Sequence, residues 1–290
     1  MIILNEKAYA EDCLKNRIVD NKPFITLSIL AKYYYHCFGY RKKKITELLI
    51  DYMEKSYPYY SSNKTSWDDN IEKIAKNAGK FNLFEIDGVW ITKSEIDTIQ
   101  DLHNKVLERL AFTMLCIAKL NNIKNPKNQG WVNTDAKEIF SLARISCSVT
   151  NRYERIGMLN QLGLLEFPKK NDNLSSRVTF INDESEKVLN ISDFRELGYE
   201  YLKFTGGNFT RCQDCGILIR NNKAGTKKYC SSCAGYTPKE TKTIVCVDCG
   251  CEIKVGSKNN KSCRCDTCQQ NKIREDTRKR VQKFRQNKQM

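Results

Sequence analysis

The amino-acid sequence predicts a mainly α-helical fold with small β elements, followed by two cysteine-rich segments and a basic tail. Three observations on the 290 residues lead to this fold class. Apolar residues recur at the three-to-four spacing of helices over residues 24–121. A helix–turn–helix pattern followed by two short strands spans residues 135–181. Ten of the fourteen cysteines fall between Cys212 and Cys268.

The N-terminal part, residues 1–93, is expected to be a helical domain with one small hairpin. Alternating apolar residues over 83–92 flank Asp87 and Gly88, a dipeptide typical of a two-residue hairpin turn. Helices are predicted before the hairpin over three ranges, 24–38, 41–57 and 66–80.

The next part, residues 94–205, is expected to form a second domain. Thr92 and Glu95 match a capping box, which predicts a long helix over residues 94–120. A further helix is expected over residues 192–204. Between them, Asp135 and Glu138 cap a short helix, and a turn leads to a second helix that ends at Gly163. The strands LLEF and RVTFI follow.

The order of helix, turn, helix and two strands is that of a winged helix, with the long helix as its first helix. The stretch YERIGMLNQLGLLEF resembles the recognition helix and first wing strand of that family. Such a fold places the start of its second helix in the major groove of DNA. Polar side chains that meet this requirement are Thr150, Asn151, Arg152 and Arg155.

The wing carries basic residues that are expected to contact phosphate, namely Lys169, Lys170 and Arg177. Winged helices also serve as protein-docking modules, so the pattern leaves a docking role open.

The cysteines of the last third fall into two matched sets. The first set has the spacing C-x2-C-x14-C-x2-C and consists of Cys212, Cys215, Cys230 and Cys233. The second has the spacing C-x2-C-x15-C-x2-C and consists of Cys246, Cys249, Cys265 and Cys268. Paired C-x2-C motifs at this separation are typical of zinc ribbons with four thiolate ligands. We therefore expect two structural zinc ions, one in residues 206–236 and one in residues 237–268.

A disulfide scaffold is the alternative for these cysteines, and it would require an oxidising compartment. The N-terminus lacks the basic-then-apolar layout of a signal peptide, and no apolar run is long enough to cross a membrane. The sequence therefore predicts a cytoplasmic protein with no membrane partner. Cys251 and Cys263 are surplus to the second set and are interpreted as small apolar filling, with alternative ligation or a redox pair left open.

Positive charge is concentrated after residue 205. Residues 206–290 hold 19 Lys/Arg and 7 Asp/Glu, a net charge of +12, whereas the first 205 residues carry only +3. Two zinc ions, each held by four thiolates, would leave about +8 in this part. Such a charge indicates a polyanionic partner, nucleic acid above all. The expected contacts are Arg220, Lys227, Lys228, Lys258, Lys261 and Arg264 on the ribbons, and Arg278, Arg280 and Lys283 in the tail, residues 269–290.

The segment LSILAKYYYHCFGYRKKKITELLIDYM resembles a small helical module found after primase or replication domains in phages and plasmids. Together with CVDCGCEIKVGSKNN and KKYCSSC, the arrangement is similar to uncharacterised DNA-associated proteins of phages and mobile elements in low-GC Gram-positive bacteria. This resemblance implies a DNA-associated role.

The motifs favour binding over catalysis. The chain has no phosphate-binding P-loop, dinucleotide-binding glycine pattern or nucleophile elbow. Asp68, Asp69 and Glu72 could hold Mg²⁺ in a nuclease, but they also fit the start of a helix. The sequence predicts a non-enzymatic, zinc-containing protein that binds duplex DNA as a replication or transcription accessory. The alternatives are RNA binding and an adaptor or inhibitor whose ribbons dock on a host protein.

Overall fold

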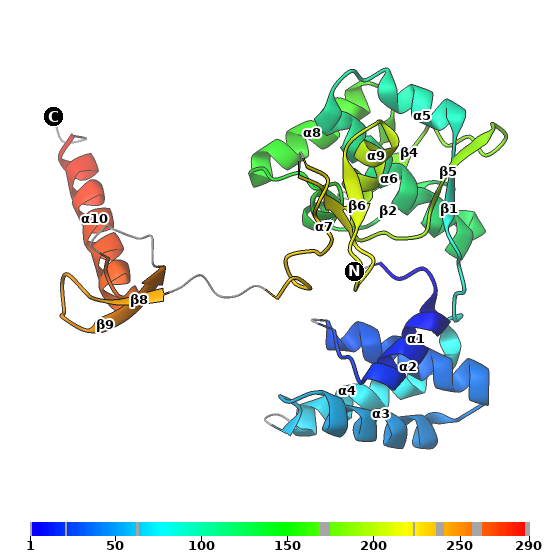
Figure 1. Ribbon diagram of the computed structural model, residues 1–290, viewed down its shortest axis with the longest axis horizontal. Helices are drawn as coiled ribbons and strands as arrows, with labels where there is room; N and C mark the ends of the chain where they lie inside the picture. Colours follow the sequence, from blue (N-terminus) through cyan, green and yellow to red (C-terminus); the bar gives the residue numbers. More distant parts are fainter. Residues whose placement is uncertain are drawn as a thin grey trace. The chain divides into compact units, whose positions relative to one another are not determined.

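The computed structural model contains two compact units, residues 1–230 and 231–290 (Figure 1). The finer division into five parts stays a prediction. Helices predominate, the sheets are small, and no helix among the described residues combines the length and apolar character needed to cross a membrane. The structure describes residues 2–20, 22–61, 64–168, 175–222, 224–235, 241–256 and 263–287.

Helices build the first 80 residues, as the sequence predicts. The elements are α1 (Glu6–Asn16), α2 (Pro23–Phe38), α3 (Lys42–Ser56), α4 (Lys64–Asn77) and the 3-10 turn η2 (Ala78–Lys80). Leu30, Leu49 and Ile71 are fully buried between them and belong to one apolar core. Gly39 ends α2 in the left-handed region, at φ 69°, where glycine is favoured because it has no Cβ. The helices at 24–38, 41–57 and 66–80 are thus confirmed.

The hairpin expected at Asp87 and Gly88 is wrong. Strand β1 (Val89–Thr92) pairs antiparallel with the distant strand β5 (Lys187–Ile191), with Val89 opposite Ile191. A Cβ at Gly88 would lie 2.1 Å from Oδ1 of Asn190, so the glycine leaves room for a side chain of β5. The glycine therefore marks a tertiary contact with the neighbouring strand instead of a local turn.

The single long helix expected over residues 94–120 is also wrong, because it is two helices. Helix α5 (Lys93–Gln100) ends, the chain turns through His103 at φ 46°, and α6 (Lys105–Lys124) begins. The Asn104 side chain accepts hydrogen bonds from the backbone N–H groups of the first turn of α6, so it acts as the N-cap. The predicted capping box at the start of α5 is confirmed.

Helix α6 is the centre of the larger core in the first unit. Its residues are buried from Leu110 through Leu120, and α9 (Leu197–Phe204) packs along it. Within this core, Lys119 Nζ donates to both carboxylate oxygens of Glu95, at 2.8 and 3.0 Å. Glu95 also accepts from the backbone N–H groups of Thr92 and Asn182. A buried charge is tolerated here because its hydrogen-bonding capacity is filled.

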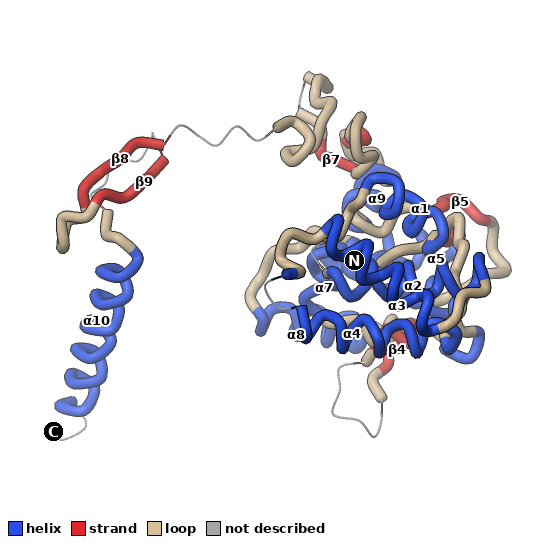
Figure 2. The backbone as a smooth tube through the Cα atoms, turned by 90° about the horizontal axis from the view of Figure 1, so that it is seen from below, coloured by secondary structure: helices blue, strands red, loops and turns tan. Residues whose placement is uncertain are grey.

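A helix–turn–helix segment with a three-stranded antiparallel sheet follows α6 and the 3-10 turn η3 (Pro126–Asn128). The sheet order is β2-β4-β3. Figure 2 shows α7 and α8 as successive helices of the first unit. The predicted helices and strands are confirmed at these positions, and the first strand is an addition that the sequence did not predict. The elements are β2 (Trp131–Val132), α7 (Ala136–Leu142), α8 (Val149–Gln161), β3 (Leu165–Glu166) and β4 (Ser176–Val178).

The cysteine-rich segments form two small antiparallel ribbons. The first, β6 (Phe209–Arg211) with β7 (Leu218–Arg220), packs on α9 of the first unit through buried Leu218 and Ile219. The second, β8 (Thr241–Val245) with β9 (Glu252–Gly256), precedes the basic helix α10 (Asp266–Asn287). Among the side chains after Ser231 whose burial the structure describes, Cys246 is the one that is both apolar and buried.

Candidate metal centres and candidate nucleic-acid interface

Two groups of four cysteines are positioned to hold metal ions. In each group the four Sγ atoms all lie within 4.8 Å of one another. The groups are Cys212, Cys215, Cys230 and Cys233, and Cys246, Cys249, Cys265 and Cys268, the two sets expected from the spacing. Among the described residues, these are the only groups of three or more His, Cys, Asp or Glu side chains that come together in this way.

The first group is built on a tight turn that aims backbone N–H groups at sulfur. The N–H of Gly216 donates to the carbonyl of Cys212 at 3.0 Å, and Gly216 has φ 69°. The N–H of Cys230 donates to Cys212 Sγ at 3.3 Å, which ties the second pair of cysteines to the first. Sγ of Cys215 and Sγ of Cys230 lie 3.7 Å apart. The strands β6 and β7 bring the two ends of this turn together.

The second group repeats this geometry. Gly250, at φ 73°, donates its N–H to the carbonyl of Cys246 at 3.0 Å. The N–H of Cys265 donates to Cys246 Sγ at 3.3 Å, and the Sγ atoms of Cys249 and Cys265 are 3.6 Å apart. Two segments of different sequence thus share one backbone design.

The electrostatics of the opening cysteines favour metal ligation. Hydrogen bonds from the backbone N–H groups of Cys215 and Cys230 lower the pKa of Cys212 to about 6. Corresponding bonds from Cys265 and Cys249 lower the pKa of Cys246 to about 6. Thiolate is the form of cysteine that binds metal, and the lowered pKa favours this form of Cys212 and of Cys246 near neutral pH. Four sulfur ligands on paired turns fit a structural zinc ion, with no position left for a reacting water.

The two surplus cysteines lie next to the second group. Cys251 Sγ is 3.4 Å from Sγ of Cys249, and the carbonyl of Cys251 accepts from the N–H of Cys246. Ile217 has the same place in the first ribbon, where its carbonyl accepts from the N–H of Cys212. Hydrogen bonds with the Cys249 and Cys265 side chains raise the pKa of Cys251 to about 12, which favours its protonated form. The carbonyl of Cys263 accepts from the N–H of Val247 at 3.2 Å.

The four residues predicted to face DNA lie on the first turns of α8 but on two different sides. Thr150 and Asn151 are exposed, beside the N-cap Ser148. Arg152 and Arg155 are half-buried and turn toward the body of the unit. Nε of Arg152 and Nη1 of Arg155 are fully buried and have no hydrogen-bond partner among the described residues.

The remaining predicted contacts are spread over both units. Arg177, predicted to lie on a wing, is in β4 and is bound to Glu166 at 3.1 Å and to the carbonyl of Gln129 at 3.0 Å. Lys169, Lys170, Lys258 and Lys261 lie outside the described residues. In the ribbons and α10, Arg264 pairs with Asp248, and the side chains of Arg220, Lys227, Lys228, Arg278 and Arg280 are exposed. Lys283 falls within α10.

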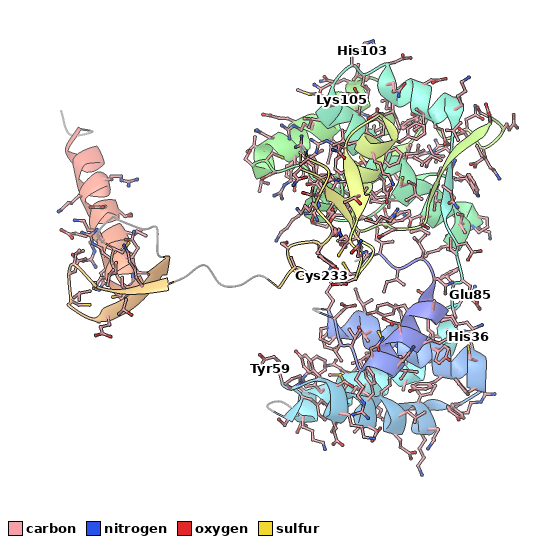
Figure 3. The ribbon with its side chains drawn as sticks, in the orientation of Figure 1. His36, Tyr59, Glu85, His103, Lys105 and Cys233 are labelled. Atoms are coloured by element: carbon pink, nitrogen blue, oxygen red, sulfur yellow. The ribbon has the colours of Figure 1, made fainter. Side chains whose placement is uncertain are left out.

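The two histidines lie apart from each other, and two of the acidic residues considered for Mg²⁺ binding have partners within the chain. His36, on α2, lies with Nε2 2.9 Å from the carbonyl of Phe81, and His103 is in the turn between α5 and α6 (Figure 3). His103 was expected inside a helix, and the break before α6 displaces it. Asp68 accepts a hydrogen bond from the Tyr60 hydroxyl, and Glu72 pairs with Lys42.

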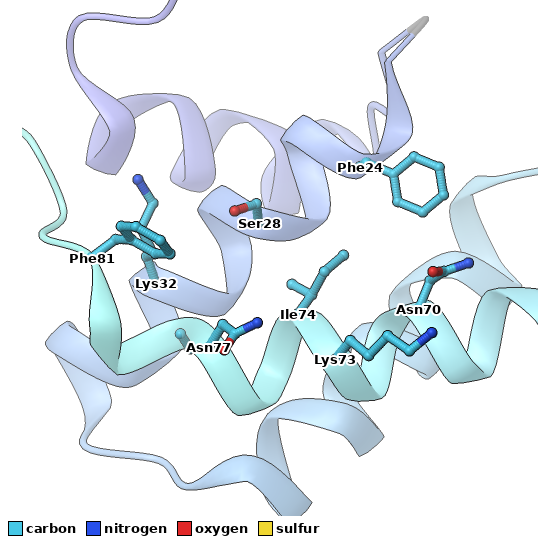
Figure 4. Close-up of a pocket in the computed structure, with 9 residues that line it drawn as sticks. Phe24, Ser28, Lys32, Asn70, Lys73, Ile74, Asn77 and Phe81 are labelled. Carbon is cyan, nitrogen blue, oxygen red and sulfur yellow. The ribbon is translucent and has the colours of Figure 1, made fainter.

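Basic side chains line several cavities of the first unit. One of about 230 Å³ lies between α2 and α4 (Figure 4). Its Lys32 is neutralised by Glu6, Lys73 is its other cation, and the remaining lining residues are mainly amide or apolar. Another, of about 420 Å³, lies between α7, the start of α8 and α9. Sequence reasoning placed Arg152 on the DNA side and missed its partners in this cavity, Lys137, Arg144 and Tyr199, because tertiary folding alone brings them together.

Comparisons with known proteins give no relative for this chain. No protein-family model, no curated protein and no solved structure matches it. The functional argument therefore depends on the two cysteine groups and on the surfaces around them.

Proposed function

We propose that this is a zinc-containing, non-enzymatic protein that binds duplex DNA and contains a winged helix formed by residues 105–180. The observation that carries the proposal is the arrangement α6–β2–α7–α8–β3–β4 with the sheet order β2-β4-β3. In a winged helix, the strand after the first helix pairs with the hairpin that follows the recognition helix, and the same pairing occurs here. The recognition helix would be α8, with Thr150 and Asn151 exposed at its start.

The two cysteine groups would each hold one zinc ion and keep the ribbons folded. The tail after residue 205 would add contacts to phosphate that depend on salt but not on base sequence. A replication or transcription role in a phage or mobile element rests only on the resemblance of CVDCGCEIKVGSKNN and KKYCSSC to the ribbons of such proteins.

A protein-docking role is the second candidate, and one observation favours it. Two separate pairs of large apolar side chains are exposed along α8, Val149 and Tyr153 at its start and Met158 and Leu162 at its end. Exposed apolar side chains that lie close together are typical of a surface that binds another protein. Under this alternative the protein is an adaptor or inhibitor, and α8 takes part beside the ribbons.

Selection of bound duplexes from a random DNA pool, with zinc-loaded protein at moderate salt, separates the two functions. We expect an enriched motif, and Asn151→Ala should weaken binding to it by about 1–3 kcal/mol. Gln161→Ala, at the exposed far end of α8, is the matched control and should leave affinity unchanged. If no duplex is retained, the DNA proposal is wrong and the docking role replaces it. If duplexes are retained without a motif, α8 does not read bases.

A further inference from the structure

The 420 Å³ cavity beside α8 is strongly basic. Lys137, Arg144 and Arg152 line it, together with the hydroxyl-bearing residues Ser141, Ser146 and Tyr199. No acidic side chain is among the described residues that line it. Its volume lies within the range of about 300–1,000 Å³ that is usual for small-ligand sites.

More positive charge lies directly behind this lining. Nη1 of Arg109, on α6, donates to the carbonyl of Arg144 at 2.9 Å, and the Arg144 guanidinium lies 5.5 Å from the centre of the Tyr199 ring. Burial and the nearby charge of Arg155 lower the pKa of Arg109. The cluster therefore joins five cations, Arg109, Lys137, Arg144, Arg152 and Arg155. The carboxylate that it engages among the described residues is Glu196, which pairs with Arg144.

Two of these cations are left with unused donors inside the protein. Nε of Arg152 and Nη1 of Arg155 are buried, and no described residue accepts a hydrogen bond from either atom. The other buried, unpartnered side-chain atoms among the described residues are the neutral hydroxyls of Thr46 and Ser56. A buried donor on a charged group without an acceptor is destabilising, more so than a neutral one. Such a group calls for an acceptor from outside the chain, either water or an anion, and Arg152 is the one of the two arginines that lines the cavity.

We propose that this basic pocket binds a phosphate group. Phosphate supplies negative charge to offset the cations, and its tetrahedral oxygens accept from guanidinium groups that approach from different directions. Ser141 and Ser146 add hydroxyl donors at the rim. The phosphate comes either from the backbone of a nucleic acid lying along α8 or from a free phosphorylated molecule. The pocket stands whether or not α8 reads bases.

Thermal unfolding of the zinc-loaded full chain tests the pocket, with inorganic phosphate or pyrophosphate compared with chloride at equal ionic strength. We expect both phosphates to raise the melting temperature of the wild type. Arg152→Met should abolish this rise, and it should also raise the melting temperature without phosphate, because an unpaired buried donor is removed. Lys137→Gln should weaken phosphate binding at least tenfold. Lys127→Gln, an exposed lysine on η3, is the matched control and should change neither quantity.

Binding of a short duplex to the same variants identifies the source of the phosphate. A fall of at least tenfold in duplex affinity for Arg152→Met and Lys137→Gln, with Lys127→Gln unchanged, assigns the pocket to a backbone phosphate. Phosphate binding that is lost in these variants while duplex affinity is unchanged assigns it to a free phosphorylated molecule. The proposal is overturned if the wild type gains no stability from either phosphate and the variants bind duplex as the wild type does.

Discussion

The two ribbons share one metal-binding design and differ in what surrounds it. In the first, Arg211 Nη2 donates to Glu200 at 2.7 Å, and Arg195 Nη2 donates to the carbonyl of Cys215 at 3.0 Å. The rings of Tyr199 and Phe209 pack against each other at a tilt of 41°, with their centroids 4.9 Å apart. The first ribbon is therefore fastened to α9, a helix of a large apolar core.

The second ribbon has no comparable core among the side chains whose burial the structure describes. Val245 and Val247 are exposed, and Cys246 is the one buried apolar side chain described after Ser231. In so small a unit, a metal ion replaces the apolar core. The two four-cysteine sites are thus expected to have different effects on folding. The first holds a ribbon against the folded first unit, whereas the second is the centre around which the second ribbon folds.

Matched ligand substitutions should give the largest effect. Cys249→Ser is expected to remove one zinc ion and the pairing of β8 with β9, because structural zinc supplies about 10–16 kcal/mol to such sites. Cys215→Ser should also remove one zinc ion, while helices α2 to α9 keep their protection. Native mass spectrometry counts the metal, and amide hydrogen exchange reports the protection. If each variant lost amide protection equally in both units, the two ribbons would not differ in their dependence on metal.

The core of the first unit should carry its stability without help from metal. Lys119→Met leaves Glu95, with its side chain 0% exposed, as an unpaired charge, so the free energy of unfolding should fall by about 3–5 kcal/mol. Lys55→Met breaks an exposed ion pair with Asp51 and should change the free energy of unfolding by less than about 1 kcal/mol. Denaturant unfolding of the first unit measures both, and the zinc content should stay at two. If Lys119→Met destabilises the first unit no more than Lys55→Met does, the buried pair of Lys119 and Glu95 does not stabilise the core as stated.

The ion pairs of the two ribbons should differ in strength. Arg211→Met leaves Glu200, with its side chain only 9% exposed, without its partner, and should cost about 1–3 kcal/mol. Arg264→Met removes a pair with Asp248 whose side chains are 34% and 40% exposed, and should lower stability less than Arg211→Met does. Chemical denaturation, followed separately for each unit, provides the comparison. If Arg264→Met proves the more harmful, the first ribbon is not the better fastened of the two.

The smallest effect is expected at the surplus cysteine of the second ribbon. Cys251→Ile introduces the residue that the first ribbon has at the equivalent position, Ile217. Two zinc ions should remain bound, and the stability of the second unit should stay close to that of the wild type, because the Cys251 side chain is exposed. Zinc analysis of the purified variant checks this, with Cys249→Ser as the comparison. Loss of one zinc ion would make Cys251 a ligand in its own right.

Local sequence patterns predicted the metal sites and most helices. Cysteine spacing, apolar periodicity and capping residues each lie within a short segment of the chain. A C-x2-C turn with a following glycine specifies its own backbone, as Gly216 and Gly250 show. The break at His103 also had a local signal in Asn104, a good N-cap residue, which the apolar periodicity on either side obscured.

Features that depend on distant contacts were not predictable in the same way. Val89 pairs with Ile191, a partner that nothing near Asp87 and Gly88 indicates. The orientation of Arg152 and Arg155 depends on which side of α8 meets the body, and scattered apolar residues such as Tyr153 and Met158 do not define that side. The basic pocket combines residues of α7, α8 and α9, so sequence spacing could not reveal it.

The central claim is that the same type of four-cysteine site has two different roles. The second ribbon depends on its metal for folding, whereas the first unit is folded by its apolar core. The most direct test is a chelator titration of the isotope-labelled full chain, followed by two-dimensional amide NMR. The account predicts that signals of Ile244 and Ile253 collapse to unfolded positions as metal is removed and return with added zinc. Signals of Leu110 and Leu115, in the α6 core, should stay in place. Simultaneous collapse of both sets, or no change in either, would contradict the account.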